Sequence, residues 1–276
     1  MKDTAILQTD LLIDVLIDAD FEDVSTLVDY LTDSGAGRVS LSTTVKTRLM
    51  TAQSEKKFTH TDLLIIEREV RSFGGNSVVN LVRDAGQFLK LLRSPESLLE
   101  QAGPNEHLIA YIEVVRDVAE RLDVKPAKDA SVVAIEGAII AAMLERSFER
   151  MSPEELKAAA EDFGAPDASF LTKDKFQSAI AAGKVTGVLN YIGAAIVANS
   201  VSTAVLGRAV FAAFMPQAVP RSVGMFFGPI GWALTSIWSI AELASPAYRV
   251  TVPCIVHVAY IRQKRLAKFA LSAPMA

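Results

Sequence analysis

The sequence predicts an all-α protein, in which a multi-helix acidic domain packs with a hydrophobic helical hairpin and a basic terminal helix. Apolar residues recur at helical spacing along the chain, and no alternating strand pattern of useful length occurs. Residues 1–182 carry 20 Lys/Arg and 31 Asp/Glu, a net charge of −11. Residues 183–276 carry 8 Lys/Arg and one acid, Glu242, a net charge of +7. The chain therefore divides into an acidic unit (1–182) and an apolar, basic unit (183–276).

The start of the acidic unit is expected to contain three helices. The first covers residues 11–18, and the second follows Asp20, whose carboxylate is placed to cap it. The Ser-Gly-Ala-Gly sequence at 34–37 ends the second helix, because its turn favours glycine's positive φ. Residues 41–52 predict a weaker helix, since threonine lowers helix propensity. A small helical subdomain over residues 1–58 is compatible with this pattern.

The next part of the acidic unit predicts helices with clear ends. Residues 62–73 form a strong helix that stops at Gly74 and Gly75, and another helix follows at 78–82. The two glycines fit a helix end followed by a new cap, or a functional hinge. Gly103-Pro104 is expected to open a long amphipathic helix that ends at Leu122.

The last part of the acidic unit contains the clearest helix start of the sequence. After a helix over 131–151, Ser152 is placed as the N-cap and Pro153 at the first helical position. Glu155 completes a capping box with Ser152. A further helix is expected after Thr172 and leads into the apolar unit.

The apolar unit contains two long uncharged segments. Residues 185–207 cover roughly 30 Å as a helix, about the thickness of a bilayer's hydrocarbon core. Residues 222–241 contain both tryptophans, Trp232 and Trp238, and are kinked by a Gly-Pro pair. The two segments predict a helical hairpin over 183–244, either buried as a soluble core or in contact with a membrane.

Small residues four apart in the hairpin favour close helix packing. The candidate packing and interface residues share this segment: Gly183, Gly187, Ala194, Ala198, Gly224, Gly228, Trp232 and Trp238. The tryptophans are expected at a membrane interface.

The terminal helix is apolar first and basic afterwards. Its cations are Arg262, Lys264, Arg265 and Lys268. They are expected to bind anionic lipid headgroups or a partner, which includes the acidic unit of the same chain. A nucleic-acid partner is disfavoured by the acidity of the remaining chain. Tyr248-Arg249 either couples this helix to the acidic unit or lies at the surface.

The sequence contains no recognisable catalytic, cofactor-binding or metal-binding motif. Cys254 and His257 lie one turn apart, but two ligands fall short of a zinc site. Neither a phosphate-binding loop nor a GxSxG elbow is present. Acid pairs such as Glu67 and Glu69 are expected on solvent-facing helix surfaces. We therefore expect a non-enzymatic protein without a cofactor.

Several sequence blocks resemble a known family. They are Leu27–Thr32, Phe73–Ser77, Tyr111–Leu122, Ala134–Glu136, Met151–Glu155 and Ala247–Pro253. In order, they are similar to the YaaW-like family of uncharacterised bacterial proteins. That family is distantly grouped with mitochondrial ubiquinol–cytochrome c assembly chaperones. The resemblance implies a helical, non-enzymatic bacterial protein and supplies no catalytic residues.

Location and function follow as expectations. The N-terminus carries acids among its first apolar residues and does not resemble a signal peptide. The protein is expected in the bacterial cytoplasm, and peripheral or integral attachment to the inner membrane is left open. The first hypothesis is a membrane-interacting protein whose hairpin inserts into, permeabilises or remodels a bilayer under some conditions. The alternative is a chaperone, assembly factor or binding module that holds an apolar helix of a membrane-protein client. Either role is compatible with oligomers.

Overall fold

The computed structural model describes residues 9–35, 41–73, 109–162, 187–207 and 248–272. These residues form helices without any strand, which confirms the all-α class. The helices are α2 (Leu12–Ile17), α3 (Phe21–Thr32), α4 (Thr43–Ser54), α5 (His60–Phe73), α7 (Tyr111–Arg121), α8 (Val132–Phe148), α9 (Pro153–Asp162), α11 (Gly187–Leu206) and α13 (Tyr248–Ser272).

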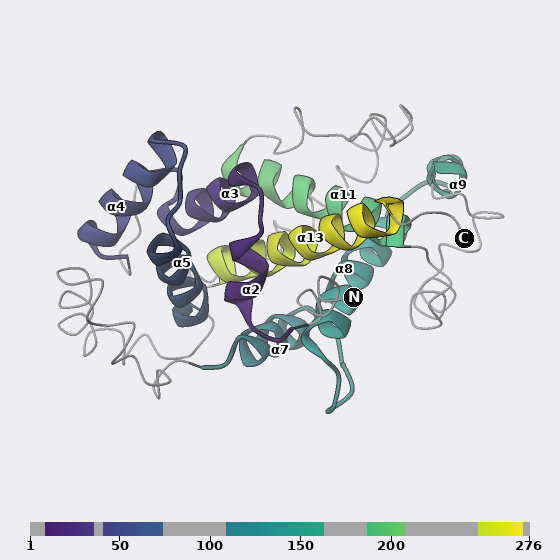
Figure 1. Cartoon of the computed structure of the whole chain (residues 1–276). Coiled ribbons are helices and arrows are strands. Elements are labelled where there is room, and N and C mark those ends of the chain that lie inside the picture. Colours follow the sequence, from purple (N-terminus) through teal and green to yellow (C-terminus); the bar gives the residue numbers. More distant parts are fainter. Residues whose placement is uncertain (1–8, 36–40, 74–108, 163–186, 208–247, 273–276) are drawn as a thin grey trace.

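The terminal helix α13 lies at the centre of the arrangement. It contacts α2, α3, α5, α7, α8 and α11, and its most extensive contact is with α11. In Figure 1, α13 crosses the middle of the view, α2 passes over it, and α4 and α9 lie towards opposite ends. Helices from the acidic unit therefore surround the last helix of the basic unit.

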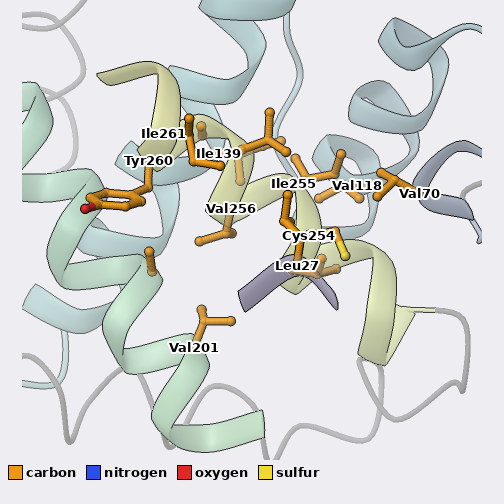
Figure 2. Close-up of a cluster of buried hydrophobic side chains, with 14 of the residues drawn as sticks. Leu27, Val70, Val118, Ile139, Val201, Cys254, Ile255, Val256, Tyr260 and Ile261 are labelled. Atoms are coloured by element: carbon orange, nitrogen blue, oxygen red, sulfur yellow. The ribbon is translucent and has the colours of Figure 1, made fainter. Parts of the chain in front are cut away.

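The burial of α13 explains why its first half is apolar on every side. All residues from Val250 to Arg262 are buried, because neighbouring helices cover the whole circumference. Figure 2 shows side chains of α3, α5, α7, α8 and α11 beside those of α13. The labelled members are Leu27, Val70, Val118, Ile139, Val201, Cys254, Ile255, Val256, Tyr260 and Ile261.

Helix α11 has the same character as α13. Its residues from Tyr191 to Ser202 are all buried, and none is charged. Gly193 allows close packing, since a Cβ at this position would lie 3.0 Å from Cδ1 of Leu144 in α8. The expected small residues Ala194 and Ala198 are fully buried in the same helix. The sequence analysis had not singled out Gly193.

Local capping agrees with the sequence at α9. The Ser152 N–H donates to Oε2 of Glu155 at 2.8 Å, and the Glu155 N–H donates to Oγ of Ser152 at 3.3 Å. A second capping box, which the sequence analysis missed, starts α5. There the Thr59 N–H donates to Oδ2 of Asp62 at 2.8 Å, and the Asp62 N–H donates to Oγ1 of Thr59 at 3.3 Å.

Three expectations about the acidic unit were wrong. Asp20 is the N-cap residue of α3, but its side chain makes no capping hydrogen bond, because it pairs with lysines of α13. Helix α7 begins at Tyr111 rather than near residue 104, because Ala110 is extended. Just before that start, the Ile109 carbonyl oxygen accepts a hydrogen bond from Arg71 Nε at 2.8 Å. Glu69 is buried and does not face solvent.

Several predicted features lie outside the described residues. They are the hinge residues Gly74 and Gly75, the unit boundary at Gly183, the second hairpin segment with Gly224, Gly228, Trp232 and Trp238, and the helix after Thr172. Gly187 begins α11. Among the described helices, none combines the length and apolarity needed to cross a bilayer.

Candidate functional site

The four cations in the second half of α13 all contact carboxylates from earlier in the chain. Arg262 pairs with Glu136, Lys264 with Asp20 and Asp23, Arg265 with Asp18, and Lys268 with Asp20. We call this set of contacts the α13 latch. It joins α13 to α8 through Glu136, to the end of α2 through Asp18, and to the start of α3 through Asp20 and Asp23.

The inner part of the latch is a buried pair between Arg262 and Glu136. Arg262 Nε donates to Glu136 Oε2 at 2.8 Å, and Nη2 donates to Oε1 at 3.3 Å. The Tyr111 hydroxyl also donates to Glu136 Oε1 at 2.9 Å, and Arg262 Nη1 donates to the Thr9 carbonyl oxygen at 3.1 Å. The two charged side chains are 0% and 1% exposed. This two-point geometry fixes α13 against α8 and the N-terminal segment.

Burial and the opposite charge of the partner act against each other on the pKa of both members of this inner pair. Desolvation raises the pKa of Glu136, while the Arg262 charge and the Tyr111 hydrogen bond oppose that rise. Burial alone would lower the pKa of Arg262, but the Glu136 carboxylate outweighs it and raises that pKa. The pKa of Tyr111 lies well above its usual value because of burial and the neighbouring carboxylate. Arg262 therefore stays charged, and Glu136 is its counter-ion.

The middle of the latch is Lys264, which lies between two aspartates. Its Nζ is 2.6 Å from Oδ2 of Asp20 and 2.8 Å from Oδ2 of Asp23. Burial raises the pKa of Asp23 despite Lys264. The pKa of Asp20 is lowered: its partial burial raises it, but the hydrogen bonds and charges of Lys264 and Lys268 together outweigh that effect. Lys264 also lies 5.7 Å from the ring centroid of Tyr260, which adds a cation–π contact.

The outer part of the latch borders a cleft. Arg265 Nη2 is 2.7 Å from Oδ2 of Asp18, and Lys268 Nζ is 3.1 Å from Oδ2 of Asp20. The cleft has a volume of about 200 Å³ and lies between the start of α3 and the second half of α13. We call it the α3–α13 cleft; its lining residues are Asp18, Ala19, Asp20, Asp23, Ile261, Lys264, Arg265 and Lys268.

His257 connects the latch to the core one and a half turns earlier on α13. It is fully buried, and its Nε2 lies 3.0 Å from the Asp23 carbonyl oxygen. A carbonyl can only accept, so Nε2 carries the proton, and Nδ1 is buried without a hydrogen-bond partner among the described residues. Burial lowers the pKa of His257 to about 3. Rings of Tyr30 and Tyr260 lie beside it, with centroids 6.0 and 5.5 Å away.

The latch offers charge pairing rather than an evident catalytic arrangement. Within the described ranges, no three His, Cys, Asp or Glu side chains gather in a way that could hold a metal ion. Each cation already has a carboxylate partner, and His257 uses Nε2 to hold α3. The arrangement can fix α13 in place and can respond to pH or to competing charges.

The predicted cations are therefore located. The sequence left an anionic lipid or the acidic unit open as their partner without indicating partner residues, and in this structure all four cations face the acidic unit. A role in lipid binding stays a prediction. At the start of α13 it is Tyr248 that makes the coupling, because the Arg121 guanidinium of α7 lies 4.9 Å from its ring centroid, whereas Arg249 is exposed.

Comparison with known proteins identifies relatives across most of the chain. A UPF0174 protein of Helicobacter pylori strain J99 is 30% identical over 200 residues, which cover 72% of this chain and 70% of the relative. The chain belongs to the UPF0174 family. The UPF0174 protein YaaW of Escherichia coli K12 is 25% identical over 208 residues, with 72% of this chain and 70% of YaaW covered. These matches confirm the YaaW-like resemblance. No family model and no solved structure matches the chain.

Proposed function

We propose that this UPF0174 protein is a non-enzymatic, conditionally membrane-interacting protein. In the structure described above, which we call the closed state, helices of the acidic unit pack against α11 and α13. In a second state, opening of the latch would present the uncharged helix α11 and its neighbouring apolar segment to a bilayer. The distant grouping with membrane-protein assembly chaperones is compatible with such a role and remains part of the proposal.

The observation that carries this proposal is how the uncharged helix is held. Helix α11 has no charged residue and packs mainly on α13. Helix α13 is in turn tied to the acidic helices by ion pairs that lie at its basic end. Ion pairs can be exchanged for other charged partners, including lipid headgroups, and the apolar contact of α11 with α13 can be exchanged for the hydrocarbon of a bilayer. The latch is therefore the natural place for a condition-dependent opening.

The test compares a weakened latch with an intact one. Asp20→Asn with Asp23→Asn removes both acids beside Lys264, and Asp123→Asn with Asp129→Asn removes two exposed acids elsewhere. The assay measures flotation with, and dye release from, vesicles that contain anionic lipid, at neutral and mildly acidic pH. We expect the latch variant to bind and permeabilise vesicles at least several-fold more than the control pair.

Three outcomes decide the proposal. Stronger vesicle association of the latch variant, with helical content retained by circular dichroism, supports it. Equal association of the latch and control variants shows that the latch does not govern lipid contact. A complete lack of association at any pH overturns the membrane role and favours the client-binding alternative.

A further inference from the structure

The α3–α13 cleft carries equal numbers of opposite charges. Three aspartates and three cations line it, with Ile261 and Ala19 as its apolar residues. Asp18 and Asp20 are 42% and 45% exposed, and Lys268 is 57% exposed, so both signs of charge are open to a ligand. The inner members of the cleft, Asp23 and Lys264, are almost fully covered.

The cleft also offers hydrogen-bond acceptors and a donor that its ion pairs do not use. The ion pairs of Asp18 and Asp20 with described residues use Oδ2, and within that part of the chain Oδ1 of each carboxylate is left to accept from a ligand. Arg265 uses Nη2 for Asp18, while its Nη1 is buried without a hydrogen-bond partner among the described residues. A small rotation of the guanidinium would present Nη1 to the cleft. A buried donor without an acceptor is costly, so an acceptor that reaches it is favoured.

Charge balance then selects the class of ligand. A simple anion would pair with the cations but would be repelled by three aspartates. A simple cation would pair with the aspartates but would be repelled by three cations. A small molecule that carries one ammonium and one phosphate can bind both sides without leaving an uncompensated charge. The volume of about 200 Å³ suits a headgroup-sized molecule rather than a nucleotide.

We propose that the α3–α13 cleft binds an ammonium–phosphodiester zwitterion, the headgroup chemistry of phosphatidylethanolamine. The ammonium donates to Oδ1 of Asp18 and of Asp20. The phosphate accepts from Arg265 Nη1 and from Lys268 Nζ. The choice of a lipid as the source rests on the proposed membrane function, whereas the headgroup site itself stands on the geometry of the cleft.

This ligand would bind the closed state without breaking the latch. The carboxylate Oδ1 atoms and Arg265 Nη1 are outside the ion pairs, and Lys268 Nζ has three N–H donors, so it can donate to Asp20 and to the phosphate together. The latch and the headgroup can therefore be held at the same time. Because a ligand that binds only the folded state stabilises it, the soluble headgroup should raise the melting temperature. In the membrane setting, the same contact would hold the closed protein at a lipid surface before any opening.

The first test uses soluble glycerophosphoethanolamine and glycerophosphocholine with the full chain. The two probes share the phosphodiester, but the choline group has no N–H donor. We expect binding of the ethanolamine probe by calorimetry, with roughly tenfold weaker binding of the choline probe, because charge-assisted N–H···O bonds are lost. Equal affinities, or no binding of the ethanolamine probe, would overturn the proposal. Stronger binding of glycerol phosphate than of the ethanolamine probe would do so too.

Matched variants locate the site. Lys268→Gln removes the exposed cation of the cleft, and Lys57→Gln removes an exposed cation of the α4–α5 connection. Asp18→Asn tests the ammonium side, with Asp129→Asn as its control. We expect several-fold weaker binding of the ethanolamine probe for both cleft variants and no change for the controls. Identical weakening in cleft and control variants would place the ligand elsewhere.

A vesicle experiment separates this site from the proposed membrane function. Phosphatidylcholine vesicles with and without phosphatidylethanolamine are compared by flotation of the wild-type protein and Lys268→Gln. Association that depends on ethanolamine lipid, and that Lys268→Gln weakens, supports a lipid source. Binding of the soluble probe without vesicle association retains the headgroup site and argues against the membrane function. Vesicle association that does not depend on ethanolamine lipid retains that function and overturns the lipid as the source of the headgroup.

Discussion

The two ends of the α13 latch use the same chemistry in opposite surroundings. Arg262 and Glu136 are 0% and 1% exposed, whereas Lys268 and Asp20 are 57% and 45% exposed, only six residues further along α13. The inner pair is shielded from solvent and depends on its opposite charge for compensation, while the outer pair remains exposed to water. The inner end therefore fixes the position of α13, and the outer end can exchange partners.

Glu136→Gln tests how strongly the inner pair depends on its opposite charges. The substitution keeps the shape of the side chain but leaves the Arg262 guanidinium buried without its counter-ion. We expect a loss of about 3–5 kcal/mol in the free energy of unfolding. Urea denaturation at neutral pH measures it.

The companion variant replaces both charges, as Glu136→Leu with Arg262→Met. Since a buried ion pair replaced by apolar groups is often neutral, we expect most of that loss to be recovered. If the double variant were as unstable as Glu136→Gln, the loss would come from packing around α8 rather than from the uncompensated charge.

A smaller effect is expected in the middle of the latch. Lys264→Met leaves Asp23 without its partner in a nearly buried position, and we expect a loss of about 2–3 kcal/mol at pH 7.5. Without Lys264, the pKa of Asp23 rises further than burial already raises it. The cost should therefore shrink as the pH falls and Asp23 takes up a proton. Urea denaturation at pH 7.5 and 5.0 compares the two; a cost independent of pH would exclude this explanation.

His257 should make the closed state sensitive to mild acid. Its pKa of about 3 lies below the unfolded value of 6.5, so the unfolded chain binds more protons between these values. The stability that neutral His257 contributes is complete above pH 6.5 and is lost as the pH falls towards 3. Between pH 6.5 and 5 the loss amounts to about 2 kcal/mol, at 1.36 kcal/mol for each pH unit.

The measurement compares the pH dependence of unfolding for the wild type and His257→Gln. The amide of glutamine can donate to the Asp23 carbonyl oxygen without titrating. Burial raises the pKa of Glu69 to about 7, so that group adds stability as the pH falls, but it does so in both proteins and cancels in the difference. If the free energy of unfolding changed with pH equally in both proteins, His257 would not take up a proton on unfolding in this range.

The fold class and several helix ends could be predicted because they depend on local sequence. The Ser152–Glu155 capping box is readable from four consecutive residues. The role of Asp20 was mistaken, because a carboxylate at a helix start is equally able to pair with a distant lysine. Nothing local distinguishes these two uses.

The latch could be anticipated only as a change of charge along the chain. The opposite net charges of the two units indicated mutual neutralisation as one alternative, but not which residues would meet. Glu136 follows four apolar residues and shows no signal of its own, yet it holds Arg262 across 126 positions. Glu69 was placed on a solvent face because its neighbours are polar, whereas tertiary packing covers it. Such pairings depend on how helices cross, which periodicity does not specify.

The outer end of the latch supplies the smallest effect. Lys268→Gln removes one hydrated partner of Asp20, which keeps Lys264, so we expect less than about 1 kcal/mol of change in the free energy of unfolding. Salt should reduce this difference further, because exposed charges are screened. Urea denaturation at low and moderate salt, with Lys57→Gln as the matched control, measures both effects. A loss as large as that of Glu136→Gln would show that the outer end is as essential as the inner one, and that partner exchange at the cleft would unfold the protein.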